Sequence, residues 1–240
     1  MPAYSSVGTA GSVTSDACAG TYEVTAQAPS TVNAGDILIY YVGASTFGGT
    51  VDTQNPPSGF TALKSVGGGT SRMVSVFYRV ADGSEDGASY TCNGAYSSFL
   101  CIGGAQIWSF TGSGTGGVVG ASGSTGSGSD TSAEMPAVTT TQANSLAVAF
   151  VAYNGSTVGE ATGESGGDWV KPLATQALTN NAVALHTANM ASIGTISGGS
   201  STLSGGSLWE VMTFEIKEAV TAAGRLFAPP LRHLQHLLIR

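Results

Sequence analysis

The sequence predicts an all-β protein, an antiparallel β-sandwich or jelly roll built from two related halves and followed by a short amphipathic tail. Three observations predict it: the composition, a series of short apolar runs bounded by turns, and the recurrence of these runs at a constant spacing. The 240 residues include 35 glycines and only 10% charged residues, and Ser and Thr are abundant. Such a composition suits short strands and tight turns and suits long helices poorly.

Apolar runs mark the core strands of the first half. They cover residues 36–42, 73–80 and 105–110, and each contains β-branched or aromatic residues. Glycines and an Asp-Gly pair bound these runs, which is typical of strands joined by turns. We therefore expect three core strands in this part of the chain.

Similar runs return in the second half, at residues 145–151, 182–186 and 209–216. Phe60 matches Trp169 at a spacing of 109 positions, and the closing residues Phe110 and Phe214 match at a spacing of 104. Recurrence of the same strands and aromatic residues indicates one diverged internal duplication.

The domain organisation has two interpretations. We favour one β-sandwich over residues 20–218, because each half alone has few large core residues; two small immunoglobulin-like domains in tandem are the alternative. The connection between the halves is Gly/Ser-rich, as in a flexible linker, although Val118 and Val119 suggest a strand within it. The expected segments are an N-terminal arm at 1–19, pseudo-repeats at about 20–112 and 133–218, the connection at 113–132 and a C-terminal anchoring tail at 219–240.

The tail differs from the rest of the chain. No acidic residue follows Glu218, and Pro229-Pro230 opens a segment in which leucines recur at helical spacing. A helix this short is marginal alone, so we expect it to be docked on its own sandwich, on a sister subunit or on another partner. The residues expected to anchor it are Leu226, Phe227, Leu231, Arg232, Leu234, Leu237, Leu238 and Arg240.

Sequence patterns for catalysis are weak. The Gly-rich segment 112–117 lacks the Gly-Lys-Ser/Thr ending of a phosphate loop, and no nucleophile elbow with a later Asp and His is present. The acids Glu85-Asp86 and Glu160/Glu164/Asp168 lie in Gly-rich loops, where a glycosidase pair is the less favoured interpretation. We expect no catalytic residue and no enzymatic activity.

Sequence patterns for metals and cofactors are equally weak. Residues 82–87 carry oxygen ligands suited to Ca²⁺ but lack the regular spacing of a calcium loop. His186 lies within a strand pattern, and His233 and His236 have no third ligand nearby in sequence. We expect no cofactor and no bound metal.

Four aromatic residues recur along the two halves: Phe60, Trp108, Trp169 and Trp209. Exposed aromatic rings could form a platform for sugar rings. Because these residues recur in the pattern of both halves, we favour packing in the core.

Net charge, cysteine count and hydropathy limit the partners and the cellular location that we expect for the protein. The net charge of −7 argues against binding nucleic acid, and no apolar stretch is long enough for a membrane span. No signal peptide is visible, and an odd number of cysteines favours free thiols in a reducing cytosol. Cys92 and Cys101 could pair across a hairpin, but small half-buried strand residues are the favoured interpretation.

Several short motifs resemble a family of tailed-phage virion proteins described as minor tail, head-fibre or decoration-like β-sandwich proteins. The motifs are Gly35-Asp36-Ile37-Leu38, Pro56-Pro57-Ser58-Gly59-Phe60-Thr61-Ala62-Leu63, Val76-Phe77-Tyr78-Arg79-Val80-Ala81, Trp108 before the Gly/Ser connection, and the restart at Thr139-Thr140-Thr141-Gln142-Ala143-Asn144-Ser145-Leu146. The resemblance covers roughly residues 20–218 and concerns strands and turns, so for function it is an argument by analogy.

The resemblance implies a structural protein of the virion, assembled in the cytoplasm of a host bacterium. We expect a capsid decoration (cement) or head-fibre subunit, held by its tail to other capsid or tail proteins. A homo-oligomer is expected, and trimers are common among virion sandwiches of this type. The alternative is a tail-fibre-type module that binds a receptor or carbohydrate, such as a glycan of the host surface.

Overall fold

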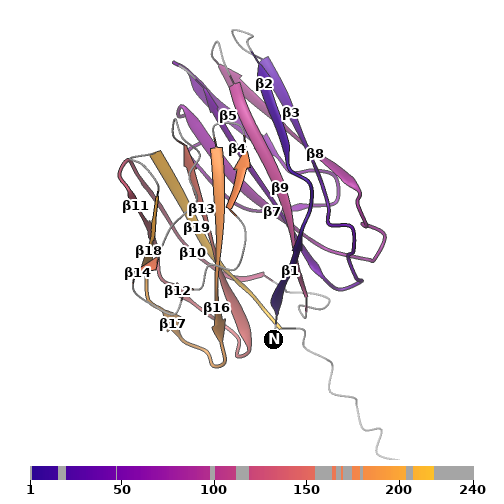
Figure 1. Ribbon diagram of the computed structural model, residues 1–240, viewed down its shortest axis with the longest axis vertical. Helices are drawn as coiled ribbons and strands as arrows, with labels where there is room; N and C mark the ends of the chain where they lie inside the picture. The colour runs from indigo at the N-terminus through magenta and orange to yellow at the C-terminus, as the bar shows by residue number, and fades with distance from the viewer. Residues whose placement is uncertain are drawn as a thin grey trace, which may run out of the picture.

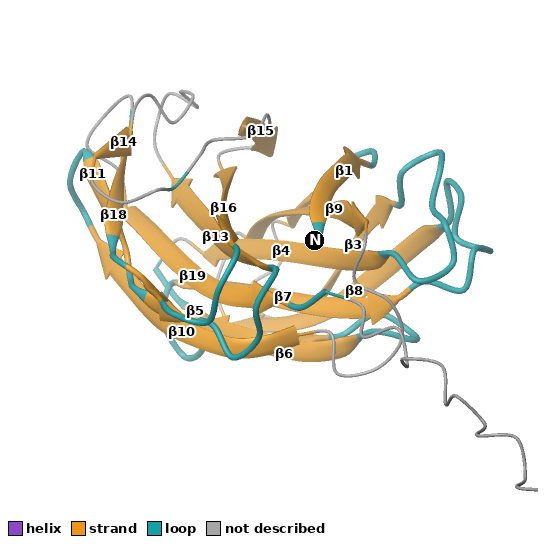
Figure 2. Ribbon diagram, turned by 90° about the horizontal axis from the view of Figure 1, so that it is seen from below, coloured by secondary structure: helices purple, strands orange, loops and turns teal. Residues whose placement is uncertain are grey.

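The computed structural model is all-β and antiparallel, which confirms the predicted fold class. Figure 2 draws strands and loops and no helix in the part of the chain that the structure describes. No membrane-spanning helix occurs among these residues. The described residues are 2–15, 20–46, 48–97, 101–111, 119–154, 164–165, 169, 175–178, 181–203 and 208–218.

The first half forms two sheets, a large one and a small one. The large sheet has the order β1-β9-β4-β7-β6, with β2 also paired to β9, and the small sheet has the order β3-β8-β5. The strands are β1 (Ala3–Val7), β2 (Gly11–Ser15), β3 (Gly20–Gln27), β4 (Ile37–Thr46), β5 (Thr50–Asn55), β6 (Thr61–Val66), β7 (Arg72–Val80), β8 (Ser89–Ser97) and β9 (Cys101–Thr111).

The second half repeats this topology. Its large sheet has the order β10-β19-β13-β16-β15, its small sheet the order β11-β18-β14, and β12 pairs with β17 beside them. The strands are β10 (Val119–Gly128), β11 (Ser132–Met135), β12 (Val138–Thr139), β13 (Ser145–Asn154), β14 (Glu164–Ser165), β15 (Thr175–Leu178), β16 (Asn181–Met190), β17 (Thr195–Ile196), β18 (Gly199–Thr202) and β19 (Leu208–Ile216).

The alternation of side chains along β4 explains why the molecule has several cores. Leu38 and Tyr40 point toward the small sheet of the same half, whereas Ile37, Ile39 and Tyr41 point toward the other half. All five are almost completely buried. A strand covered on both faces is apolar at every position, which is the continuous run seen in the sequence.

Three hydrophobic cores result. One lies between the two sheets of the first half, one between the sheets of the second half, and a third between the two large sheets. Figure 1 shows the strands of the first half, indigo to magenta, gathered beside those of the second half in orange. The two large sheets thus form a sandwich across the halves, while each half also has its own inter-sheet core.

The core between the halves is built from equivalent residues, those that occupy the same place in the ladders of the two halves. Tyr41 and its equivalent Phe150 stack on each other, with ring centroids 6.1 Å apart and planes inclined by 28°. Each half therefore contributes the same face, as in an isologous dimer. The equivalent pairs are Ile37 with Leu146, Ile39 with Val148, Tyr41 with Phe150, Val74 with Val183, Val76 with Leu185, Trp108 with Phe214 and Phe110 with Ile216.

The ladder register corrects one detail of the predicted duplication. Phe110 lies opposite Ile37, but the residue opposite Leu146 is Ile216, so Phe110 corresponds to Ile216 and not to Phe214. The closing strands are therefore offset by two residues from the match suggested by their phenylalanines. Phe214 and Ile216 face the same core, because side chains along a strand alternate with a period of two.

Two segments outside the predicted pseudo-repeats are strands of the large sheets. The expected N-terminal arm contains β1 and β2, which pair with β9, and the expected Gly/Ser-rich connection contains β10, which pairs with β19. Ladder hydrogen bonds come from the backbone and need no large side chain. At Gly128 a side chain is excluded, because a Cβ there would lie 2.5 Å from Cζ2 of Trp209.

Candidate functional site

The acidic loop considered for calcium is held by contacts within the protein. Glu85 is 1% exposed, accepts the backbone N–H groups of Asp82 and Gly83, and lies 2.7 Å from the Arg79 guanidinium. Asp82 accepts hydrogen bonds from both the amide and the hydroxyl of Ser84, which hold the pKa of this carboxyl below its usual value. These carboxylates serve the turn that joins β7 to β8.

Further carboxylates fasten the loop that precedes the central strand of each half. In the first half, Asp86 Oδ1 accepts the backbone N–H of Val32 at 2.6 Å. In the second half, the buried Glu215 accepts the backbone N–H groups of Thr141 and Gln142 and the Thr141 hydroxyl. Within the described ranges, no three His, Cys, Asp or Glu side chains gather as a metal site.

The histidine and cysteine that can be described are packed in strands. His186 is buried, and its Nε2 lies 3.2 Å from the Ser201 hydroxyl, so it is a hydrogen-bonded strand histidine. Cys92 is a buried free thiol, and burial raises its pKa to about 12. It is therefore not bonded to Cys101, whose side chain, like Cys18, lies outside what the structure describes.

The four recurrent aromatic residues are in the cores, as predicted. Trp108 is fully buried between the halves, and Phe60 is 7% exposed between the sheets of the first half. Trp169 and Trp209 are 4% and 5% exposed between the sheets of the second half. Phe60 and Trp169 thus occupy matching cores, and these four rings do not form an exposed platform for sugars.

Other predicted residues fall outside the described part of the chain. These are the whole anchoring tail at 219–240, including Leu226, Phe227, Leu231, Arg232, Leu234, Leu237, Leu238 and Arg240, together with His233, His236, Glu160 and Asp168.

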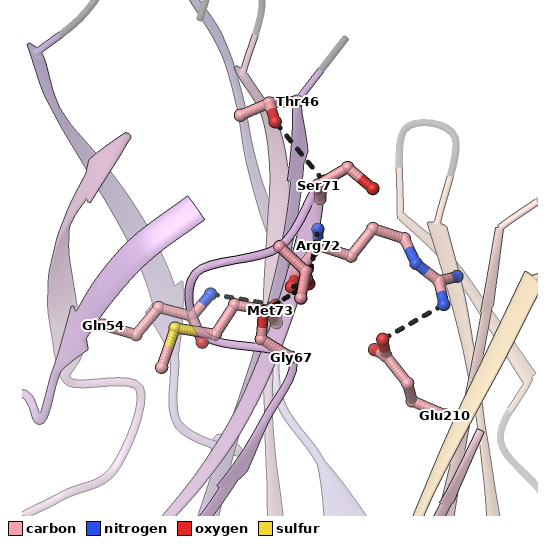
Figure 3. Close-up of polar contacts among 8 residues, drawn as sticks. Thr46, Gln54, Gly67, Ser71, Arg72, Met73 and Glu210 are labelled. Carbon is pink, nitrogen blue, oxygen red and sulfur yellow. Dashed lines mark hydrogen bonds and ion pairs between the residues drawn. The ribbon is translucent and has the colours of Figure 1, made fainter. Parts of the chain in front are cut away.

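A cleft between the two halves brings together a pair of charges that sequence reasoning missed. Arg72 begins β7, Glu210 lies on β19, and Arg72 Nη2 is 3.0 Å from Glu210 Oε1 (Figure 3). Their side chains are only 13% and 6% exposed. The residues that line this inter-half cleft are Val66, Gly67, Thr70, Ser71, Arg72, Ser127, Gly128 and Glu210.

The turn that joins β6 to β7 packs closely against this ion pair. Gly67 has φ of +86°, and a Cβ at this position would lie 2.4 Å from the carbonyl oxygen of Arg72 and 3.3 Å from Glu210 Oε1. Thr70 donates its hydroxyl hydrogen to the Arg72 carbonyl at 2.7 Å, which fixes the start of β7. The turn that joins β6 to β7 therefore has glycine where the charges approach.

Burial dominates the electrostatics of Glu210. Burial raises the pKa of this carboxyl above its ordinary value, and the Arg72 guanidinium only partly offsets that rise. Tyr41, buried nearby, also has a raised pKa, first because of burial and then because of the Glu210 charge. The signal in the sequence was an acid among the apolar residues at the start of the closing strand, Trp209-Glu210-Val211-Met212.

Comparison with protein families, with characterised proteins and with solved structures finds no match to this chain.

Proposed function

We propose that the chain is a non-enzymatic structural protein of a tailed-phage virion, a capsid decoration (cement) or head-fibre subunit. The observation that supports this most is the use made of its polar side chains. Glu85, Asp86 and His186, which were first considered for chemistry, and the buried Glu215 each hold a turn or bridge two strands. Polar side chains that hold turns and bridge strands stabilise the fold, as is typical of a structural protein.

The arrangement of the halves agrees with a scaffold role. Two sandwiches joined by a continuous buried core form one closely packed block, and such a block suits a structural subunit of a particle. β-Sandwich and jelly-roll folds serve in viral capsids and also in lectins, so the fold alone does not choose between these roles. The sequence resemblance described above favours the virion.

In this proposal the segment 219–240 anchors the block to other virion proteins, and copies of the chain associate with one another, a trimer being the arrangement to test first. Assembly takes place in the cytoplasm of the host bacterium. The alternative, a receptor-binding module of a tail fibre, would need a sugar site other than the four buried aromatic residues.

Electron microscopy of particles labelled with an antibody against the protein tests the proposal. Label on heads supports a decoration or head-fibre subunit, label on fibre tips supports the receptor-binding alternative, and unlabelled particles contradict both. Deletion of 224–240 tests the anchor separately: we expect loss of incorporation into particles with unchanged folding of the block. Full incorporation of the truncated chain would contradict an anchoring tail.

A further inference from the structure

We propose that the inter-half cleft is a binding site for a neutral polyhydroxylated ligand, a saccharide, held by Arg72 and Glu210. The cleft measures about 480 Å³, within the range of roughly 300–1,000 Å³ typical of small-molecule sites. One wall comes from the β6–β7 turn of the first half and the other from β10 and β19 of the second. The proposal does not depend on a virion location.

The fold itself does not require the ion pair. Glu210 lies opposite Ala152, and the equivalent place in the first half, opposite Gly43, is occupied by Gly104. The equivalent of Arg72, two residues before the matching valine of its strand, is Asn181. The charged pair is thus not repeated at the equivalent positions of the other half. Taking two charges out of water is costly, so a pair that the duplication does not repeat suggests a role beyond stability.

Both charged groups have hydrogen-bonding capacity left. A guanidinium carries five N–H donors and a carboxylate two acceptor oxygens. Within the described part of the chain, the Arg72 guanidinium is bonded to Glu210 alone, through one nitrogen and one oxygen. A ligand in the cleft can therefore accept hydrogen bonds from the guanidinium and donate hydrogen bonds to the carboxylate.

The charge balance indicates the chemical class of the ligand. Arg72 and Glu210 neutralise each other at 3.0 Å, so an anion would meet the carboxylate and a cation would meet the guanidinium. A hydroxyl group both donates and accepts, and two neighbouring hydroxyls of a sugar match the fork of an arginine beside a carboxylate. Ser71 and Ser127, both exposed, add hydroxyls to the rim.

A second depression lies beside the cleft and offers room for a longer saccharide. It measures about 700 Å³, shares Ser127 with the inter-half cleft, and includes Glu134, Pro136 and Trp209 in its lining. Ser127 therefore lies between the two depressions. A large side chain at this exposed position, opposite Glu210 in the β10–β19 ladder, would fill the cleft beside the ion pair.

The test is binding of the full chain to an array of neutral and acidic oligosaccharides, followed by calorimetric titration of the strongest binder. We expect a neutral saccharide to bind, and we expect Ser127→Trp and Arg72→Lys each to weaken binding at least about tenfold. Arg72→Lys keeps the charge but removes the fork. Arg79→Lys, at the ion pair with Glu85, is the matched control and leaves the affinity unchanged.

Three outcomes would overturn the proposal. One is an array on which the folded wild-type protein binds no saccharide, and another is a preference for acidic saccharides. The third is undiminished binding by Ser127→Trp when its melting temperature equals that of the wild type. None of these bears on particle labelling, so the virion proposal stands or fails separately.

Discussion

The two halves share one topology but distribute their core volume differently. In the first half, β4 points Leu38 and Tyr40 into the inter-sheet core, whereas the equivalent residues of β13 are Ala147 and Ala149. The second half regains the volume at the closing strand, where Trp209 stands at the place of Gly103.

Three of the large side chains also satisfy their polar atom inside their own half. The Tyr40 hydroxyl donates to the Val24 carbonyl at 2.7 Å, Trp169 Nε1 donates to the Ser197 carbonyl, and Trp209 Nε1 donates to Asp130. A duplicated sandwich can therefore carry its large side chains on the central strand in one half and on the neighbouring closing strand in the other, provided that the total filling and the hydrogen bonds are kept.

We expect the largest loss of stability from a substitution at Tyr40, because no other side chain of the first half can fill the volume of its ring. Tyr40→Ala imitates the second half at this strand position, but no tryptophan replaces Gly103, so a cavity remains. We expect the free energy of unfolding to fall by about 3–5 kcal/mol. Urea denaturation measures the change, and Tyr40→Phe, which removes only the hydroxyl, should cost about 1 kcal/mol. Equal losses of unfolding free energy in Tyr40→Ala and Tyr40→Phe would mean that the Tyr40 ring does not fill the core of the first half as described.

The loop before the central strand offers the next comparison. Glu215→Ala removes the carboxylate that accepts from Thr141 and Gln142, and we expect a loss of about 2–3 kcal/mol in the free energy of unfolding. Ile193→Ala, at the exposed tip of the β16–β17 loop, is the control and should change stability by less than about 0.5 kcal/mol. A loss confined to about 0.5 kcal/mol for Glu215→Ala would mean that the loop is held by other contacts.

Gly128 tests why the strand that begins the second half is composed of small residues. The added methyl of Gly128→Ala meets the Trp209 ring, and we expect a cost of about 1–3 kcal/mol by thermal denaturation. At Gly68 the nearest atom to a new Cβ is Cε of Met73 at 3.7 Å, an ordinary contact, so Gly68→Ala should be close to neutral. If the two substitutions change the stability equally, β10 does not approach the Trp209 ring as closely as described.

These segments also show how far sequence reasoning reached. The apolar runs predicted β4, β7, β9, β13, β16 and β19 because inward side chains carry that signal. By composition β10 resembled a linker, because its pairing is made by backbone groups and its residues are mostly small, and only Val118 and Val119 suggested a strand there. The Arg72–Glu210 pair was missed because the two residues meet only across the interface of the halves, 138 positions apart.

The smallest expected effect concerns the pH dependence of the interface. Because the pKa of Glu210 is raised in the folded state, its contribution to stability is fully present below the unfolded pKa and is lost as the pH rises through the folded value. Glu210→Gln removes this dependence. The melting temperature of the variant relative to wild type should therefore rise between about pH 4 and pH 7. A relative fall over this range would mean that attraction to Arg72 outweighs the cost of burial.

The cooperativity of unfolding tests the central claim that the halves share one core. Tyr41, Trp108, Phe150 and Phe214 are nearly inaccessible to solvent in that core, so neither half can unfold without exposing the other. Differential scanning calorimetry of the whole chain should give one transition whose calorimetric and van't Hoff enthalpies agree. Phe150→Ala should shift that transition as a whole. Two separate transitions, of which Phe150→Ala moves only one, would contradict the account.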